Sequence, residues 1–188
     1  MKKGSVILSM ALVLGMAAAC AKQALQTTYD KQATYIESFV SSQMKADTNA
    51  TLIRNGGSYR LTLHDTLDRV LGKRDSLQDG GKVALWYVCY TLTGNSLTTA
   101  NVVATNAKEI DEQLRWNLSD STRFKLDTLT LDKSLVEGLR LGLQGVQQYD
   151  EGYVLFTGQY GFGNIARGTI PARSALVYQY WIEKIYNE

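Results

Sequence analysis

The 188-residue chain has 45% apolar and 20% charged residues, the composition of a globular protein that can bury a sizeable core. Its formal net charge is only +2, and no stripe of Lys and Arg is interleaved with aromatic residues, which argues against a dedicated nucleic-acid-binding protein. The chain has one histidine and no cluster of metal ligands, so we expect no metal site.

The N-terminus has the three-part form of a secretory signal peptide. Lys2 and Lys3 precede an uncharged, mostly apolar run over residues 5–19 that ends in three alanines. This run of 15 residues is short for a membrane-spanning helix, which needs about 20 residues. We therefore predict a signal peptide over residues 1–19, with a stable N-terminal membrane anchor as the alternative.

Cys20 follows directly after this run, and the arrangement resembles a bacterial lipobox, although Ala17 stands where Leu or a similar residue is usual. Acyl chains on Cys20 would attach the protein to a membrane, because more than one chain gives stable anchoring. Simple cleavage after Ala19 is the alternative. Lipidation would leave Cys89 without a disulfide partner, and we expect it to be a small core residue. The sequence thus predicts an exported lipoprotein of a bacterial cell envelope, facing the periplasm or the cell surface.

Small polar residues over 20–29 are interpreted as the tether of this anchor. Apolar residues at spacings of three and four then predict an amphipathic helix over 30–45. Thr28 or Asp30 is a candidate N-cap, since either side chain accepts hydrogen bonds from free backbone N–H groups.

A β-hairpin is predicted after this helix. Residues 51–54 and 59–62 flank Asn55-Gly56-Gly57, and Asn-Gly between alternating residues is a strong hairpin signal. We therefore assign residues 30–78 to an N-terminal helix and hairpin extension.

The rest of the chain alternates between strand-like and helix-like patterns. Strands are predicted at residues 83–92, 124–131, 151–156 and 175–186, and helices at 107–114 and 135–146. The second helix carries Gly138, Gly142 and Gly145, although glycine in a helix interior costs about 1 kcal/mol relative to alanine. We expect these glycines to mark close packing, which suits an α+β fold in which a sheet buries one face against this helix.

Three motifs follow one another in this half of the chain. They are Gly138-x-x-x-Gly142 on the helix, Tyr160-Gly161-Phe162-Gly163, and Ile170-Pro171-Ala172-Arg173-Ser174-Ala175-Leu176-Val177-Tyr178. Their order and spacing resemble the FKBP family of peptidyl-prolyl cis-trans isomerases. The strand after Asp79-Gly80-Gly81 looks like the first long strand of that family, so the resemblance covers residues 79–188. It implies an antiparallel β-sheet curled around one short helix.

The resemblance also implies an apolar pocket for proline-containing exported polypeptides. The planar X-Pro amide resists rotation with a barrier of about 20 kcal/mol. Twisting the amide removes charge separation, so a dry aromatic pocket favours the twisted state without a metal, nucleophile or cofactor. The implied catalytic contacts are Tyr90, Phe162, Tyr178 and Val136, whose backbone N–H is the expected donor to the substrate. The implied substrate-binding residues are Val103, Phe124, Leu135, Leu139 and Ile170.

Two positions depart from the family pattern. Phe162 stands where the family usually has Tyr, and Tyr160 would restore the hydroxyl only with a short gap. Ala104 replaces an acidic residue if Val103-Ala104-Thr105 matches the family's Phe-Asp-(Ser/Thr) segment, and the alternative match at Leu97-Thr98-Thr99 also lacks the acid. Three functions therefore stay open: an isomerase with a weakened site, a non-catalytic peptide-binding or scaffold lipoprotein, and a structural lipoprotein whose pocket is filled by its own side chains.

Overall fold

The computed structural model describes residues 3–63, 72, 74–108 and 124–187, with side chains from residue 22 onward. The chain divides into two compact units, Met1–Lys31 and Gln32–Glu188. No helix among the described residues is both long enough and apolar enough to cross a membrane.

Helix α1 spans Lys3–Ala46, so the helix expected over 30–45 is confirmed but its expected start is wrong. Residues 20–29, interpreted as a tether, are helical. The hydroxyls of Thr27 and Thr28 each donate at 3.0 Å to the carbonyl oxygen four residues earlier. The physical reason is that no glycine or proline interrupts residues 16–55, and that the Ala, Lys, Gln and Leu of this segment are good helix formers.

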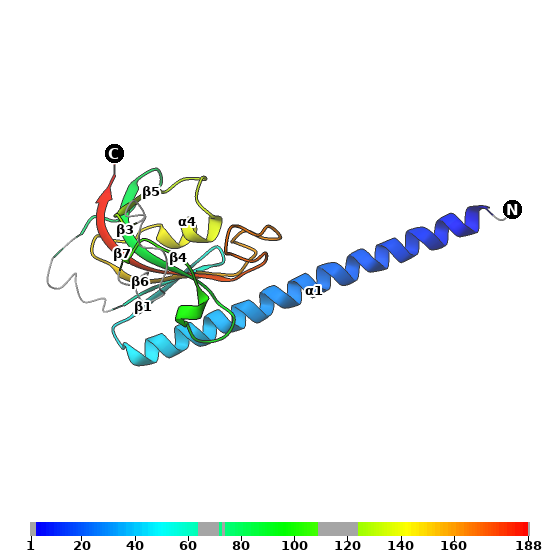
Figure 1. Ribbon diagram of the computed structural model, residues 1–188, viewed down its shortest axis with the longest axis horizontal. Coiled ribbons are helices and arrows are strands. Elements are labelled where there is room, and N and C mark those ends of the chain that lie inside the picture. Colours follow the sequence, from blue (N-terminus) through cyan, green and yellow to red (C-terminus); the bar gives the residue numbers. More distant parts are fainter. Residues whose placement is uncertain (1–2, 64–71, 73, 109–123, 188) are drawn as a thin grey trace. The chain divides into compact units, whose positions relative to one another are not determined.

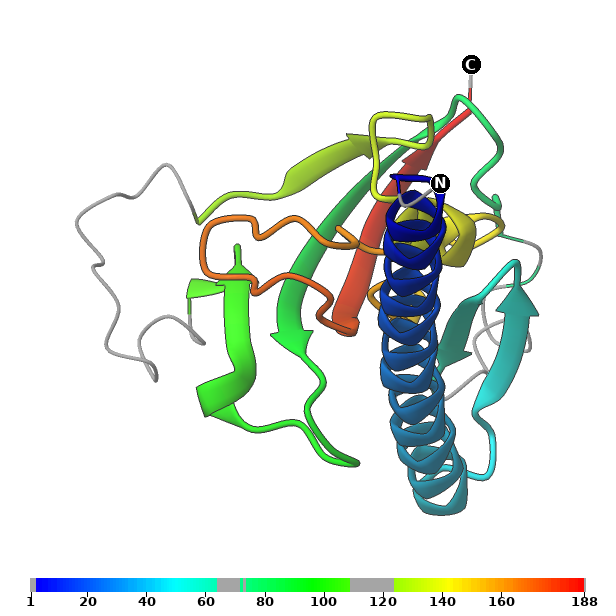
Figure 2. The ribbon, with the colours of Figure 1, turned by 90° about the vertical axis from the view of Figure 1, so that its right-hand side faces the viewer.

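The sheet has seven strands in the order β1-β2-β6-β7-β3-β4, with β5 paired to β3 off this path, and every pairing is antiparallel. The long strands β3 and β7 lie side by side at its centre (Figure 2). The strands are β1 (Thr51–Asn55), β2 (Ser58–Thr62), β3 (Lys82–Thr91), β4 (Val102–Thr105), β5 (Asp127–Thr130), β6 (Glu151–Phe156) and β7 (Leu176–Tyr186), with the 3₁₀ turn η1 at Thr99–Asn101 before β4 and helix α4 at Glu137–Leu143.

The predicted hairpin is confirmed as β1 and β2. Asn55 pairs with Ser58, and Gly56 and Gly57 form the turn with φ angles of 54° and 96°. Both positions need positive φ, which glycine adopts without the steric penalty of a Cβ atom. Because β2 also pairs with β6, the hairpin extends the sheet to which residues 79–188 contribute.

The two faces of the sheet bury different helices, because successive side chains on a strand point to opposite faces. Val154 and Phe156 of β6 pack in the core that contains Leu139 and Leu143 of α4. Leu155, between them in sequence, packs in the core that contains residues 36–40 of α1. Figure 1 shows the sheet curling around α4. The predicted α+β class, an antiparallel sheet curled around one short helix, is therefore confirmed.

Gly138 and Gly142 are positions of close approach, as the sequence predicted, whereas Gly145 lies after the helix and a Cβ atom there would meet only the Arg60 side chain, at 3.9 Å. A Cβ atom on Gly138 would overlap the Phe156 ring, and one on Gly142 would overlap Val154. The helix is shorter than the predicted 135–146, because it begins after Val136 and ends at Leu143, before Gly145 with φ of 76°.

The strands predicted at 83–92, 151–156 and 175–186 are confirmed within one residue at each end. The strand predicted over 124–131 is shortened to Asp127–Thr130. Most of the helix predicted over 107–114 lies outside the described residues.

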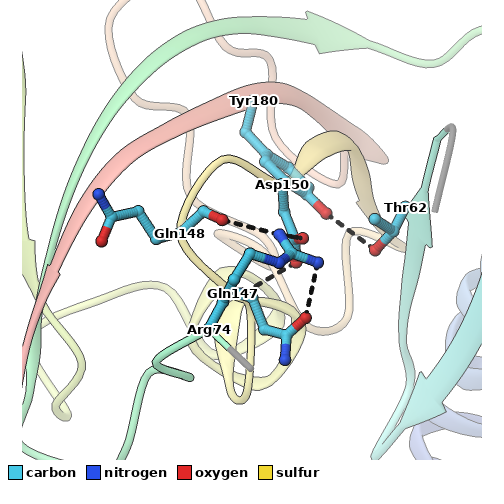
Figure 3. Close-up of polar contacts among 6 residues, drawn as sticks. All are labelled: Thr62, Arg74, Gln147, Gln148, Asp150 and Tyr180. Atoms are coloured by element: carbon cyan, nitrogen blue, oxygen red, sulfur yellow. Dashed lines mark hydrogen bonds and ion pairs between the residues drawn. The ribbon is translucent and has the colours of Figure 1, made fainter. Parts of the chain in front are cut away.

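A buried ion pair fixes the connection between α4 and β6 (Figure 3). Arg74 and Asp150 lie 2.8 Å apart with side chains 5% and 7% exposed. Arg74 also donates to the carbonyl oxygen of Gln148 at 2.7 Å and to the side-chain oxygen of Gln147 at 2.8 Å. The second carboxylate oxygen of Asp150 accepts from the Gln147 N–H at 2.8 Å. Each charge therefore has several partners, which a buried ion pair requires.

Candidate functional site

An apolar cavity of about 260 Å³ lies where the start of α4 meets the central strands. Strands β3, β5 and β7 form one side of it, and α4 with the loop over residues 157–175 forms the other. Its lining residues are Leu85, Tyr87, Asp127, Leu129, Ser134, Leu135, Val136, Leu139, Phe162 and Tyr178.

The cavity brings together five of the nine pocket residues expected from the sequence: Leu135, Val136, Leu139, Phe162 and Tyr178. Val136 is the N-cap of α4, with φ of −54° and ψ of 133°. No hydrogen bond among the described residues uses its backbone N–H. The N–H of Val136 is therefore available to a ligand.

Tyr178 is the aromatic residue at the centre of the β7 wall. Its ring stacks on Phe156 with a centroid distance of 6.1 Å and lies 5.9 Å from the ring of Tyr87. Burial raises the pKa of the Tyr178 hydroxyl well above its usual value, and a hydrogen bond with the Cys89 thiol contributes. The hydroxyl is therefore neutral at physiological pH, and the wall it belongs to stays uncharged. Cys89 itself is fully buried on β3, as predicted.

Tyr90, expected on the same wall, is instead on the opposite face of β3. Leu85 and Cys89 face the α4 side of the sheet, whereas Tyr90 packs in the core around α1. The cause is the period of two along a strand, which places Tyr87 in the cavity and excludes Tyr90. The structure therefore places Tyr87 in the cavity and Tyr90 outside it.

The remaining three expected residues lie around the cavity without lining it. Val103 lines a neighbouring cavity of about 270 Å³ on β4. Ile170 packs against the α4-side core, and the hydroxyl of its neighbour Thr169 donates to the Val103 carbonyl at 2.9 Å. Phe124 is half-buried and lines neither cavity.

Sequence reasoning missed Tyr87 and Asp127, which line both cavities. Asp127 supplies a carboxylate to the wall where Ala104 lacks one. Asn106 joins β3 to the segment before β5: its side chain accepts from the Tyr87 N–H at 2.7 Å and donates to the Lys125 carbonyl at 3.1 Å. The alternation of Leu85, Tyr87 and Cys89 was the signal for Tyr87, whereas the position of Asp127 depends on the register of β5.

Tyr160 does not supply the hydroxyl that Phe162 lacks. Its ring packs over Gly57 in the β1–β2 turn, so closely that a Cβ atom on Gly57 would overlap it. The Tyr160 carbonyl accepts from the Gly138 N–H at 2.8 Å, which ties the loop to α4. Within the described part of the chain, no three His, Cys, Asp or Glu side chains gather as a metal site.

An antiparallel sheet that curls around one short helix, with an apolar cavity at the start of that helix, defines the FKBP-like class of folds. No family model matches the sequence, and no curated protein sequence matches it either. Solved structures do match. FkpA from Escherichia coli has a TM-score of 0.56 at 12% identity, over 99% of this chain and 74% of that chain. A peptidyl-prolyl cis-trans isomerase from Pseudomonas syringae pv. tomato has 0.56 at 13% identity, over 86% and 96%.

The structure of the three FKBP domains of wheat FKBP73 gives 0.55 at 12% identity, over 74% of this chain and 52% of that one. At such identities the likeness is one of fold. The chain therefore has an FKBP-like fold, and its chemistry must be argued from its own residues.

Proposed function

We propose that the chain is an FKBP-type peptidyl-prolyl cis-trans isomerase or folding helper that acts on X-Pro bonds of exported polypeptides. The observation that carries this proposal is the apolar cavity beside the unused N–H of Val136, in a fold shared with peptidyl-prolyl isomerases.

The proposed mechanism uses shape and desolvation rather than bond-making groups. The proline ring occupies the cavity between Leu139, Phe162 and Tyr178, and the Val136 N–H donates to a substrate carbonyl. Held in this way, the X-Pro amide exchanges water for an apolar wall. The planar amide is the more polar form because resonance separates its charges. Desolvation therefore raises the energy of the planar form more than that of the twisted form, which lowers the barrier.

The neighbouring cavity on β4 suits the backbone that leads away from the proline. Asp127 and Tyr87 line both cavities, so in this proposal an extended peptide that leaves the apolar cavity runs along them. The Asp127 carboxylate is an acceptor for a substrate N–H. In this proposal the Asp127 carboxylate takes the role of the acidic side chain that the family pattern has where this chain has Ala104.

The location we propose is the bacterial envelope, with a lipid on Cys20. The supporting observations are the signal-like run over residues 5–19 and the cysteine that follows it. Mass spectrometry of the N-terminal peptide from membranes tests this. A diacylated or triacylated Cys20, absent in Cys20→Ser, is the expected result, and an unmodified Cys20 overturns it.

A second candidate function is peptide binding without catalysis. It is favoured by Phe162, which has no hydroxyl, and by Ala104, which has no carboxylate. The same cavity would then hold a proline-containing segment of an envelope partner, and the protein would act as a scaffold.

One experiment separates these functions. The full chain is added to a short X-Pro peptide, and NMR exchange spectroscopy measures cis–trans interconversion while chemical shifts report binding. Faster exchange supports the isomerase. Binding without faster exchange supports the scaffold. If folded protein neither binds nor accelerates, both proposals fail, and the cavity belongs to a structural lipoprotein.

A further inference from the structure

A separate cavity lies on the face of the sheet opposite α4. It has a volume of about 340 Å³, and it lies between α1, the loop after β3, and the sheet residues Tyr90, Tyr153 and Gln179. Small-molecule sites occupy about 300–1,000 Å³, so the cavity suits a compact ligand. It includes Tyr90, the one tyrosine that the family resemblance assigned to the peptide pocket and that the structure places elsewhere.

The walls of this cavity are polar and uncharged. None of its nine lining residues is Asp, Glu, Lys, Arg or His. Seven of them carry a hydroxyl or a carboxamide, including Gln43 on α1, Asn95 on the loop, and Gln179 on β7.

Most of these groups have no protein partner. The hydroxyl of Tyr90 donates to the side-chain oxygen of Gln179 at 3.2 Å. Among the described residues, no other hydrogen bond uses the Gln179 side chain, the Tyr153 hydroxyl, or the carboxamides of Gln43 and Asn95. Apart from the bond between Tyr90 and Gln179, the donors and acceptors that line this cavity do not satisfy each other.

Two tyrosines give the cavity rigid apolar surfaces. Tyr153 and Gln179 are paired across β6 and β7, and the Tyr90 hydroxyl reaches the same glutamine from β3. The Tyr153 ring is held edge-on against Phe39 at a centroid distance of 5.2 Å and an angle of 85°. Burial raises the pKa of both Tyr90 and Tyr153, so both hydroxyls stay protonated and act as donors as well as acceptors.

These walls select one class of ligand. A charged ligand would lose hydration without finding a counter-ion. An aliphatic ligand would displace water from the carboxamides of Gln43, Asn95 and Gln179 without offering them hydrogen bonds, and each group left unpaired in this way opposes binding. A sugar ring carries hydroxyls around its rim and C–H groups on its faces, which match the carboxamides and the tyrosine rings. We propose that this cavity binds a neutral saccharide unit, independently of any isomerase activity.

The test is a titration of the full chain with glucose, N-acetylglucosamine, maltose and cellobiose, followed by calorimetry and by NMR of the side-chain amides. We expect saturable binding with shifts at Gln43, Asn95 and Gln179. Gln179→Ala and Asn95→Ala should each weaken binding by about 2- to 10-fold, the loss expected for one or two hydrogen bonds. Gln159→Ala, an exposed glutamine outside the cavity, is the matched control and should bind as the natural protein does.

Three results would overturn the proposal. One is that none of the four sugars shows saturable binding, even at concentrations well above the millimolar range. Another is sugar binding that Gln179→Ala and Asn95→Ala leave unchanged, which places the site elsewhere. The third is binding of a neutral amide such as N-methylacetamide in this cavity while the sugars fail. A proline-peptide assay on the same samples shows separately whether the isomerase proposal stands.

Discussion

The side chain of Gln32 on α1 donates to the carbonyl oxygen of Arg173 at 2.6 Å, and its oxygen accepts from the N–H of Gly158 at 2.9 Å. One carboxamide thus joins the two ends of the loop that carries Phe162. Gly158 has no side chain where the backbone of Arg173 approaches, and a Cβ atom there would lie 2.5 Å from the Arg173 carbonyl oxygen. The loop is therefore closed at its base by a residue far away in sequence.

Replacing Gln32 should loosen this loop. Gln32→Ala removes two hydrogen bonds, and we expect the free energy of unfolding to fall by about 1–2 kcal/mol. Trypsin should also cut after the exposed Arg167 faster, because local opening becomes easier. Urea unfolding and timed proteolysis measure both effects.

The matched control is Gln26→Ala on the same helix. It loses only one exposed bond to Asp30, four residues away, and such pairs contribute about 0.2–0.5 kcal/mol. Equal cleavage rates after Arg167 in the two variants would show that Gln32 does not hold the loop.

The packing of α4 predicts a destabilising alanine. Gly138→Ala gains about 1 kcal/mol of helix propensity, but its Cβ would overlap the Phe156 ring. Overpacking of this kind costs about 1–3 kcal/mol, so we expect a net loss of stability and a lower melting temperature. Gly94→Ala is the control, because open space surrounds Gly94. A Gly138→Ala protein more stable than the natural one would contradict the close approach.

The elements that sequence analysis found are those with strong local signals. The hairpin was predictable because its turn needs positive φ at Gly56 and Gly57. The close packing of α4 was predictable because glycines in a helix indicate a close contact. The start of α1 was not, because helix formers continue through a segment whose polarity suggested a tether. Local pattern alone does not define where an uninterrupted helix begins.

The candidate site was predicted in part for a related reason. Leu135 and Val136 directly precede α4 and Leu139 lies in its first turns, so one short stretch of chain matched to the family motif supplies three neighbouring residues of the cavity. The assignment of Tyr90 to the pocket depended on matching a strand to a family pattern. A shift of that match by an odd number of residues moves a side chain to the other face of the sheet. The position of Asp127 in the cavity wall depends on the pairing of β5 with β3, a long-range contact that no local pattern encodes.

Replacing Arg74 should destabilise the fold far more than replacing Arg54, because Arg74 belongs to a buried ion pair and Arg54 to an exposed one. Arg74→Met leaves the Asp150 carboxylate buried without its partner, and burial already raises the pKa of this group. Breaking such a pair costs about 3–5 kcal/mol. Arg54→Met breaks the Arg54–Glu37 pair, whose side chains are 55% and 44% exposed, and exposed pairs contribute about 0–1 kcal/mol. Chemical denaturation of both variants tests this, and similar losses would refute the contrast.

The Cys89 thiol predicts a loss of stability at alkaline pH. Burial raises the pKa of Cys89 to about 12 in the folded chain, whereas an unfolded cysteine titrates near about 8.5. Above pH of about 8.5 the unfolded state binds fewer protons than the folded state, so stability falls as pH rises toward 12. The contribution is fully present below pH of about 8.

The measurement is urea unfolding between pH 7.5 and 9.0, where unfolded tyrosines, with a pKa near about 10, are still mostly protonated. We expect stability to fall by up to about 1 kcal/mol per pH unit at the upper end. Cys89→Ala lacks this thiol and should show a flatter profile, whatever its absolute stability. Parallel profiles for the two proteins would mean that the pKa of Cys89 is the same in the folded and the unfolded chain.

The final prediction concerns the donor at the start of α4. Val136 has φ of −54°, which proline adopts without strain since its ring holds φ near −65°. Val136→Pro therefore removes the N–H while the backbone keeps its course. If this N–H donates to the substrate, kcat/KM on an X-Pro peptide should fall about tenfold, the effect of one lost hydrogen bond. Val136→Ala shortens the side chain but keeps the donor, and should retain more activity than Val136→Pro. Equal melting temperatures would show that both variants are folded, and full activity in Val136→Pro would remove the Val136 N–H from the mechanism.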